Sequence, residues 1–253
     1  MTQAWLMRNK LKFTLALAAL GLGGLWMVNA MESTGLKAGG MTASQIFGDA
    51  KVVALAHAIE HEDLQAITQA VEHGADIRAQ GIHGESLLHW ASLKPNVQAA
   101  TIEHLLKLGA DPNAALTKIN YSALQIAAGG TRPDILELML KYGGNPNVQA
   151  TNGRTPLQEA ISSQFEVNVK ILFKYGADPN LGHACLSTVS SARFDFTALL
   201  LQHGLTKDLP LCRRYIEGRN VGKEYLETLE QRVKVLQMLE ERGVGPGGSD
   251  TPR

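Results

Sequence analysis

Histidine and acidic side chains cluster near residue 60 and are the first candidates for chemistry. His57 and His61 are four residues apart, so on a helix they would share one face with Glu60 between them. This spacing can hold a zinc ion, because imidazole is a common zinc ligand. The alternative places His57 at an inward position of the fold and His61 on its surface. We favour this alternative and predict no metal site.

Motifs for phosphate binding or covalent catalysis are missing from the sequence. Gly218 and Gly222 precede Lys223 at the wrong spacing for a phosphate loop, and Glu224 stands where a Ser or Thr should ligate magnesium. No G-x-S-x-G and no C-x-x-C motif occurs. An enzyme needs a positioned acid, base or nucleophile in a pocket that excludes water. We therefore predict a non-enzymatic protein without catalytic residues or a cofactor.

The chain has two cysteines, Cys185 and Cys212. Two are too few for a disulfide scaffold or a Cys-rich zinc site. An oxidising compartment would permit a bridge between them if their Cα atoms lie within ~7 Å. Two buried free thiols, acting as small apolar residues, are the alternative.

Charge is balanced over the chain but unevenly distributed. There are 24 basic and 24 acidic residues in all, whereas residues 31–206 carry 12 basic and 16 acidic residues, a net charge of −4. A mildly acidic body repels phosphate backbones, which argues against nucleic-acid binding. The same charge predicts that a protein partner is basic overall.

The first thirty residues have the pattern of a targeting segment. Arg8, Lys10 and Lys12 precede an uncharged run over residues 13–31. A basic segment followed by an apolar one is typical of a signal peptide, and Val28 and Ala30 place small residues before a cleavage point. We predict that residues 1–30 are a signal peptide or an uncleaved signal anchor. Either would place the rest of the chain in the periplasm, soluble or anchored to the inner membrane.

The body of the chain is an internal repeat. Four similar phrases, HGADI, LGADPN, YGGNPN and YGADPN, recur with their glycines spaced by 35, 34 and 33 residues. A second set of phrases, ESLLHWA, YSALQIA and TPLQEA, lies between them. The first glycines are Gly74, Gly109, Gly143 and Gly176, and the lead leucines of the second set are Leu88, Leu124 and Leu157.

The period and both phrases resemble the ankyrin repeat over about residues 50–205. The best unit contains Thr155-Pro156-Leu157-Gln158 and ends in Gly176-Ala177-Asp178-Pro179-Asn180. The resemblance implies an all-α repeat solenoid of about five helix-turn-helix units with β-turn fingers. It also implies that His89, at the His position of the TPLH-like turn, braces the backbone between repeats. Ser86 and Thr155 are expected to cap the short helices that follow them.

We expect five segments along the chain: the leader at 1–30, a linker and N-terminal cap at 31–50, ankyrin repeats at 51–206, a C-terminal helical cap at 207–242 and a disordered tail at 243–253. Apolar residues at helical spacing predict an amphipathic capping helix over 224–242. They are Leu226, Leu229, Val233 and Leu236.

Counting from each lead leucine gives the positions at which ankyrin partners usually bind, the finger tips and the concave helix ends. The predicted partner-binding residues are His83, Glu85, Lys118, Ile119, Tyr121, Thr151, Asn152, Arg154, Ser162 and Ser163. Tyr121 and Arg154 are the expected hot spots, because aromatic residues and Arg dominate interface energies. Arg154 is expected to pair with a carboxylate of the partner. The stretch 177–184 is too short for a fourth finger.

The leader, the divergent repeats and the helical cap resemble exported bacterial ankyrin-repeat proteins. Several of these are immunity proteins that neutralise lipase toxins delivered by type VI secretion. The resemblance implies a protein partner rather than a nucleic acid or a small-molecule substrate. We expect a periplasmic immunity protein, and an envelope scaffold or adaptor at the inner membrane is the alternative. An effector acting on host proteins is disfavoured by the leader.

Overall fold

The computed structural model describes residues 41–94, 97–190, 193–219 and 226–246. The predicted leader at 1–30 and most of the predicted linker lie outside these ranges. The helices within them are α3 (Ala43–Phe47), α4 (Ala50–His61), α5 (Leu64–Glu72), α6 (Leu87–Ser92), α7 (Ala99–Lys107), α8 (Ala123–Ala128), α9 (Pro133–Lys141), α10 (Pro156–Ser162), α11 (Glu166–Lys174), α12 (Ala184–Ser190), α13 (Phe194–Gln202), α14 (Leu209–Gly218) and α15 (Leu226–Glu240).

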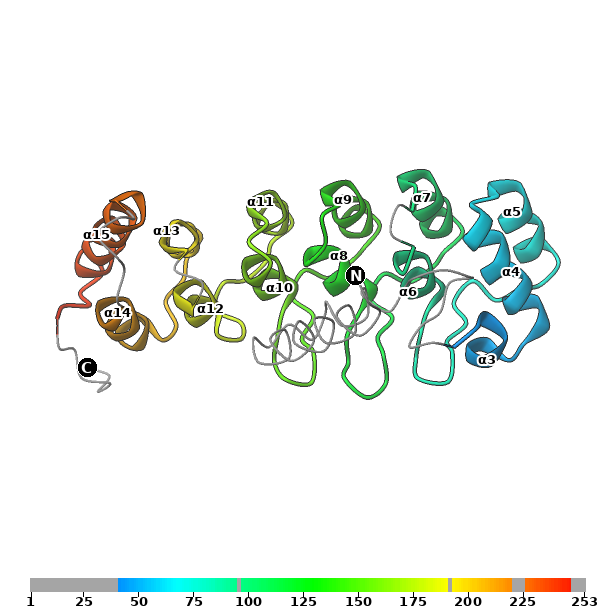
Figure 1. Cartoon of the computed structure of the whole chain (residues 1–253), viewed down its shortest axis with the longest axis horizontal. Coiled ribbons are helices and arrows are strands. Elements are labelled where there is room, and N and C mark those ends of the chain that lie inside the picture. The colour runs from blue at the N-terminus through cyan, green and yellow to red at the C-terminus, as the bar shows by residue number, and fades with distance from the viewer. Residues whose placement is uncertain (1–40, 95–96, 191–192, 220–225, 247–253) are drawn as a thin grey trace, which may run out of the picture.

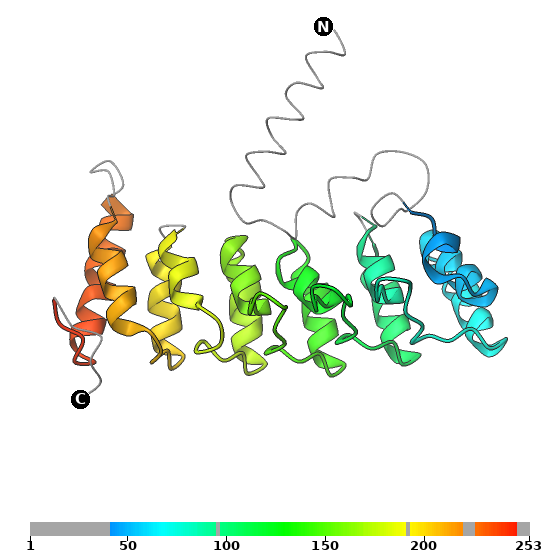
Figure 2. The same cartoon turned by 90° about the horizontal axis from the view of Figure 1, so that it is seen from below.

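From α4 onward the helices form pairs that stack side by side along one axis (Figures 1 and 2). Helices α6, α8, α10, α12 and α14 make an inner layer, and the second helix of each pair makes an outer layer (Figure 1). Three long loops project from the inner layer at the starts of α6, α8 and α10 (Figure 1). The predicted fold class, an all-α repeat solenoid, is confirmed.

Local sequence signals explain where the inner helices begin. Ser86, Ser122 and Thr155 are the N-caps of α6, α8 and α10, and each side-chain oxygen accepts a hydrogen bond from a backbone N–H in the first turn. These bonds satisfy amides that have no partner inside the helix. Pro156 occupies the first turn of α10, where a missing N–H costs nothing. The predicted caps at Ser86 and Thr155 are confirmed.

Glycine ends the outer helices. Gly74, Gly109, Gly143 and Gly176 have φ between 84° and 98°, in the left-handed region. A residue with a Cβ is strained in this conformation, so Gly is the residue that can turn the chain there. The repeat of glycines read from the sequence is therefore a repeat of helix stops.

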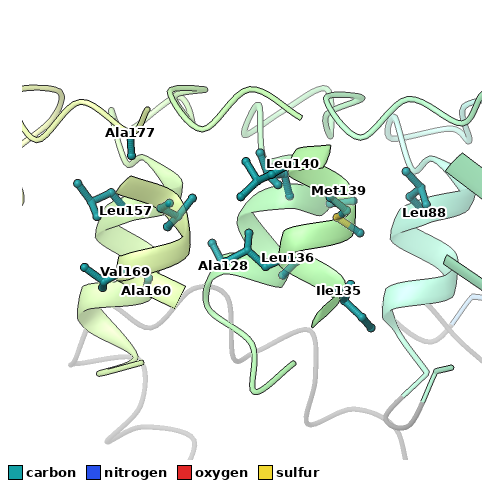
Figure 3. Packing of buried hydrophobic residues seen from close by; sticks show 14 of the residues in the cluster. Leu88, Ala128, Ile135, Leu136, Met139, Leu140, Leu157, Ala160, Val169 and Ala177 are labelled. Carbon is teal, nitrogen blue, oxygen red and sulfur yellow. The ribbon is translucent and has the colours of Figure 1, made fainter. Parts of the chain in front are cut away.

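The core is one continuous apolar layer that runs through the stack. Leu88 of α6, Leu136 of α9 and Leu157 of α10 are each at most 1% exposed (Figure 3). Burying one leucine completely contributes about 1.5–3 kcal/mol. One helix pair cannot enclose these side chains alone, so every repeat depends on its neighbours.

The last residue of the GADPN phrase joins consecutive repeats. Asn113 Nδ2 donates to the Gly143 carbonyl, Asn147 to the Gly176 carbonyl and Asn180 to the Gly204 carbonyl, each at 3.0 Å. These hydrogen bonds connect each repeat to the glycine turn at the end of the following repeat.

The C-terminal cap consists of two helices, α14 and α15, which continue the stack as a further pair (Figure 2). Arg213, which is 4% exposed, holds this pair together. Its guanidinium donates to Glu217 at 2.7 Å, to Glu240 at 3.0 Å and to the Val244 carbonyl at 2.8 Å. Val244, which lies in the predicted disordered tail, therefore packs on the cap, and residues 247–253 lie outside the described ranges.

The predicted apolar seam of the terminal helix is wrong in part. Val233 is 66% exposed, whereas Val235 and Leu239 are fully buried. Both sets have helical spacing, so the sequence pattern fits either face. Packing against α13 decides which face turns inward.

Candidate protein-binding surface

Three hairpin-like loops form the projecting edge of the molecule. We call them finger 1 (residues 80–86), finger 2 (115–122) and finger 3 (149–154), and together they are the finger row. Backbone hydrogen bonds close each one: Gly81 N–H to the Glu85 carbonyl at 2.8 Å, Leu116 to Tyr121 at 3.0 Å and Ala150 to Arg154 at 2.9 Å. Between α11 and α12 only a short loop is present, as expected for 177–184 (Figure 1).

Backbone hydrogen bonds also join each finger to the next. Ile82 N–H donates to the Ile46 carbonyl of α3, Thr117 N–H to His83 at 2.8 Å, and Thr151 N–H to Ile119 at 2.9 Å. Gly84, with φ +88°, permits this approach, because a Cβ there would lie 2.7 Å from the Ala115 carbonyl oxygen. The finger row is therefore one connected surface that starts from α3.

Two side chains of the inner helices brace the bases of fingers 2 and 3. His89 Nε2 donates to the Tyr121 carbonyl at 3.0 Å, and its Nδ1 accepts from Ser86 N–H at 3.2 Å. Burial lowers the pKa of His89, because the charged ring would be desolvated. Gln125 occupies the same place one repeat later and donates to the Arg154 carbonyl at 3.0 Å. The predicted bracing role of His89 is confirmed.

Five of the predicted partner-binding residues lie open at the tips of the fingers. Ile119 is 49% exposed, and the neighbouring Ile82 of finger 1, at a counted tip position, is 60% exposed. The open predicted residues are His83, Lys118, Ile119, Thr151 and Asn152. Their role in binding remains a prediction.

Glu85 is placed differently. It is 6% exposed, and its carboxylate accepts from both the backbone N–H and the Nδ1 of His83, each at 2.9 Å. Its structural role is to hold the turn of finger 1. We expected Glu85 to be exposed to a partner. This expectation is wrong, because the tight turn of finger 1 buries the carboxylate against His83.

Arg154 is paired inside the chain. Its Nε donates to Glu159 Oε1 at 2.7 Å, and its Nη2 donates to Glu159 Oε2 and to Ser162 Oγ, both at 3.0 Å. The bidentate bond to Glu159 raises the pKa of Arg154. The expectation that Arg154 offers its guanidinium to a partner carboxylate is corrected, because Glu159 already occupies it.

Tyr121 lies beside the same carboxylate and is partly buried at the base of finger 2. Burial raises the pKa of its phenol, and the negative charge of Glu159 raises it further. Tyr121, Arg154, Glu159 and Ser162 therefore form one cluster between finger 2 and α10. Sequence reasoning missed Glu159, and its only signal was an acidic residue five positions after Arg154.

Ser162 and Ser163 end α10 on the concave side, next to Gly129 of the preceding repeat. Both serines are half-buried, and a Cβ on Gly129 would lie 3.4 Å from Ser163 Oγ. Ser162 Oγ is the acceptor for Arg154. Gly129 and Gly130 are half-buried as well, so this helix end is packed against the preceding repeat.

The two histidines near residue 60 are both engaged locally. His57 Nδ1 lies 3.0 Å from Glu60 Oε2, and His61 Nδ1–H donates to the His57 carbonyl at 2.8 Å. His57 is exposed, so its expected inward position is wrong. In the described ranges no group of three or more His, Cys, Asp or Glu side chains is placed to hold a metal ion.

Cys185 and Cys212 are joined in a disulfide, with their Cα atoms 6.0 Å apart. Both are buried, and the bridge connects α12 to α14. The bridge therefore links the fifth helix pair (α12 and α13) to the sixth (α14 and α15), which the finger row does not reach.

A hollow of about 270 Å³ lies on the outer layer, over α13. Its walls carry charged and apolar side chains together with Gln202 and Gln231. Two of its charges are neutralised locally, Lys170 by Glu166 and Asp195 by Arg193 at 2.5 Å. Both carboxylates of the hollow, Glu166 and Asp195, are therefore engaged in ion pairs.

Comparison with known families and proteins agrees with this architecture. Residues 88–183 match the ankyrin-repeat family, as three copies of the repeat. Residues 88–183 therefore carry ankyrin repeats, and the helix pairs of the described ranges stack as an all-α repeat solenoid. Ankyrin repeats in general mediate binding to protein partners and are non-enzymatic. In the described part of the chain, no helix combines the length and the apolar character that crossing a bilayer requires.

Particular relatives come from bacteria and from eukaryotes. Protein PhlB of Serratia liquefaciens is 37% identical over 131 residues, which are 51% of this chain and 56% of PhlB. The E3 ubiquitin-protein ligase Ufd4 of Drosophila melanogaster is 34% identical over 103 residues, 40% of this chain and 4% of Ufd4. The regulatory protein NPR6 of Arabidopsis thaliana is 29% identical over 162 residues, 60% of this chain and 32% of NPR6. The match thus spans from 4% to about half of the length of these relatives.

Proposed function

We propose that this chain is a non-enzymatic immunity protein or inhibitor of the periplasm, which binds a cognate secreted toxin of the lipase type through its finger row. The observation that carries the proposal is the finger row itself. It is a connected edge with Ile82 and Ile119 open at consecutive tips.

Exposed isoleucines on consecutive fingers favour a protein partner. A single exposed apolar residue is ordinary, but neighbouring ones on a projecting edge are typical of interaction sites. The backbone bonds between fingers fix their relative positions before a partner arrives. Little conformational entropy is then lost on binding, which favours affinity.

Two features support a periplasmic location. Residues 1–30 have the pattern of an export leader. The Cys185–Cys212 disulfide would persist in an oxidising compartment and would be reduced in the cytosol. A periplasmic binding module is the expected form of an inhibitor that meets an incoming toxin.

The test is capture followed by inhibition. The full chain, tagged at its C-terminus, is expressed in its native host, recovered from the periplasm with its partners and analysed by mass spectrometry. We expect a hydrolase to co-purify and to lose activity when one equivalent of the chain is added back. Recovery of inner-membrane structural proteins without a hydrolase would favour the envelope scaffold instead.

A matched pair of variants locates the surface. Ile82→Asp with Ile119→Asp places two charges on the finger tips, and we expect capture and inhibition to fall at least tenfold. Val167→Asp with Val233→Asp makes the same change on the outer layer, where these side chains are 58% and 66% exposed. The second pair should leave both readouts unchanged. The opposite pattern would move the interface to the outer layer.

A further inference from the structure

The charge of the finger row differs from that of the whole body. Glu85 is the only carboxylate of the three fingers, and it is buried against His83. The basic side chains of the row are His83, Lys118 and Arg154. The net charge of −4 of residues 31–206 is therefore located elsewhere.

Several other carboxylates of the described ranges have local tasks away from the finger tips. Asp49 and Asp63 cap helices α4 and α5. Acidic residues of the outer layer pair with neighbouring cations, as Glu103 does with Lys107 at 3.1 Å. On the concave edge, Glu62 pairs with Lys94. None of these groups gives the finger row an exposed negative charge.

One cation of the finger row is available to a partner. Arg154 is neutralised by Glu159, and the His83 ring is held by Glu85. Lys118 is exposed, and its ammonium group has no ion-pair or hydrogen-bond partner in the part of the chain that the structure describes. It precedes Ile119 at the tip of the middle finger.

We propose that the finger row recognises an apolar patch bordered by carboxylates on a protein partner. Lys118 pairs with an Asp or Glu of the partner, and Ile82 and Ile119 cover its apolar patch. This inference rests on the proposed function and replaces the expectation of a basic partner, because the local charge decides what faces the interface. A nucleic acid or an anionic membrane would call for a broad basic surface, and the row offers one free ammonium group.

A peptide selection tests the recognition chemistry without knowledge of the partner. The full chain is immobilised, and a random twelve-residue display library is selected on it in parallel with Lys118→Glu. We expect the native chain to enrich peptides in which Asp or Glu adjoins an aromatic or aliphatic residue. Lys118→Glu should lose that enrichment and favour Lys or Arg at the same place. Lys141→Glu, a change at an exposed lysine of α9 on the outer layer, is the control and should behave like the native chain.

A kinetic measurement and the finger variants separate the possible failures. Association of an enriched acidic peptide should slow at least fivefold between 50 and 300 mM NaCl, and Lys118→Ala should remove most of that dependence. Selection of basic peptides by the native chain, or equal selection by Lys118→Glu, would overturn the inference. If the charge prediction fails but Ile82→Asp with Ile119→Asp abolishes peptide binding, then the finger row is the binding surface and only its predicted charge preference is wrong. If those variants bind normally, the proposed surface itself is wrong.

Discussion

The guanidinium of Arg154 and the carboxylate of Glu159 form a bidentate ion pair between finger 3 and α10, with N–O distances of 2.7 and 3.0 Å. The Glu159 side chain is 10% exposed and that of Arg154 is 26% exposed. Arg154→Ala would leave a buried carboxylate without its partner, which is costly. We expect the free energy of unfolding to fall by about 2–3 kcal/mol, measured by urea denaturation.

A double variant and an exposed pair serve as controls for this prediction. Adding Glu159→Gln to Arg154→Ala removes the stranded charge and should restore part of the lost stability. Lys170→Ala breaks an exposed pair with Glu166 and should cost less than about 1 kcal/mol. Equal losses for Arg154→Ala and Lys170→Ala would show that the Arg154 pair is also screened by solvent.

His89 should make stability depend on pH. Its pKa in the folded chain lies below the ordinary value of 6.5, with burial as the main cause. Below pH 6.5 the unfolded chain therefore binds a proton that the folded chain resists. The stability that the neutral His89 ring contributes is fully present above pH 6.5 and is lost as the pH falls toward the folded pKa. The slope for this one group is at most about 1.4 kcal/mol per pH unit.

The variant His89→Gln isolates that contribution. Gln125 makes the equivalent bond with its amide, so Gln at position 89 should keep a donor for the Tyr121 carbonyl. We expect the change in urea midpoint between pH 7.5 and pH 5.5 to be smaller in His89→Gln than in the native chain. An unchanged pH dependence would assign the effect to another group.

The Cys185–Cys212 bridge should be present in protein recovered from an oxidising compartment. Mass analysis under non-reducing, denaturing conditions should find the chain lighter by two hydrogen atoms. The cysteines are 27 positions apart in the sequence, and for a loop of this length the loop-closure model gives a loss of about 3–4 kcal/mol when the bridge is removed. Cys185→Ser with Cys212→Ser should show that loss in the C-terminal pairs, measured by hydrogen exchange. Two free thiols on the exported chain would contradict the bridge.

The sequence by itself determined the features that depend on residues a few positions apart. Ser86 and Thr155 cap helices by bonding to amides within their own first turn, and Gly176 stops a helix because of its own φ. These constraints recur with each repeat, so the period, the helix pairs and the three fingers could be read before any packing was known. The bracing role of His89 was also predictable, because the repeat places the backbone of the next finger, with the Tyr121 carbonyl, beside it.

Tertiary structure alone decided which side chains are buried and which are paired. Glu85 and Glu159 are charged residues that would be expected at the surface. In the structure Glu85 is buried in the turn of finger 1, where it accepts from His83, and Glu159 is paired with Arg154. Val233 and Val235 both fit a helical stripe, and the contact with α13 selected Val235 as the buried one. Burial depends on the atoms that adjoining segments supply, as Tyr121 of the preceding finger does beside Glu159 and α13 does for Val235, and sequence spacing alone does not contain that information.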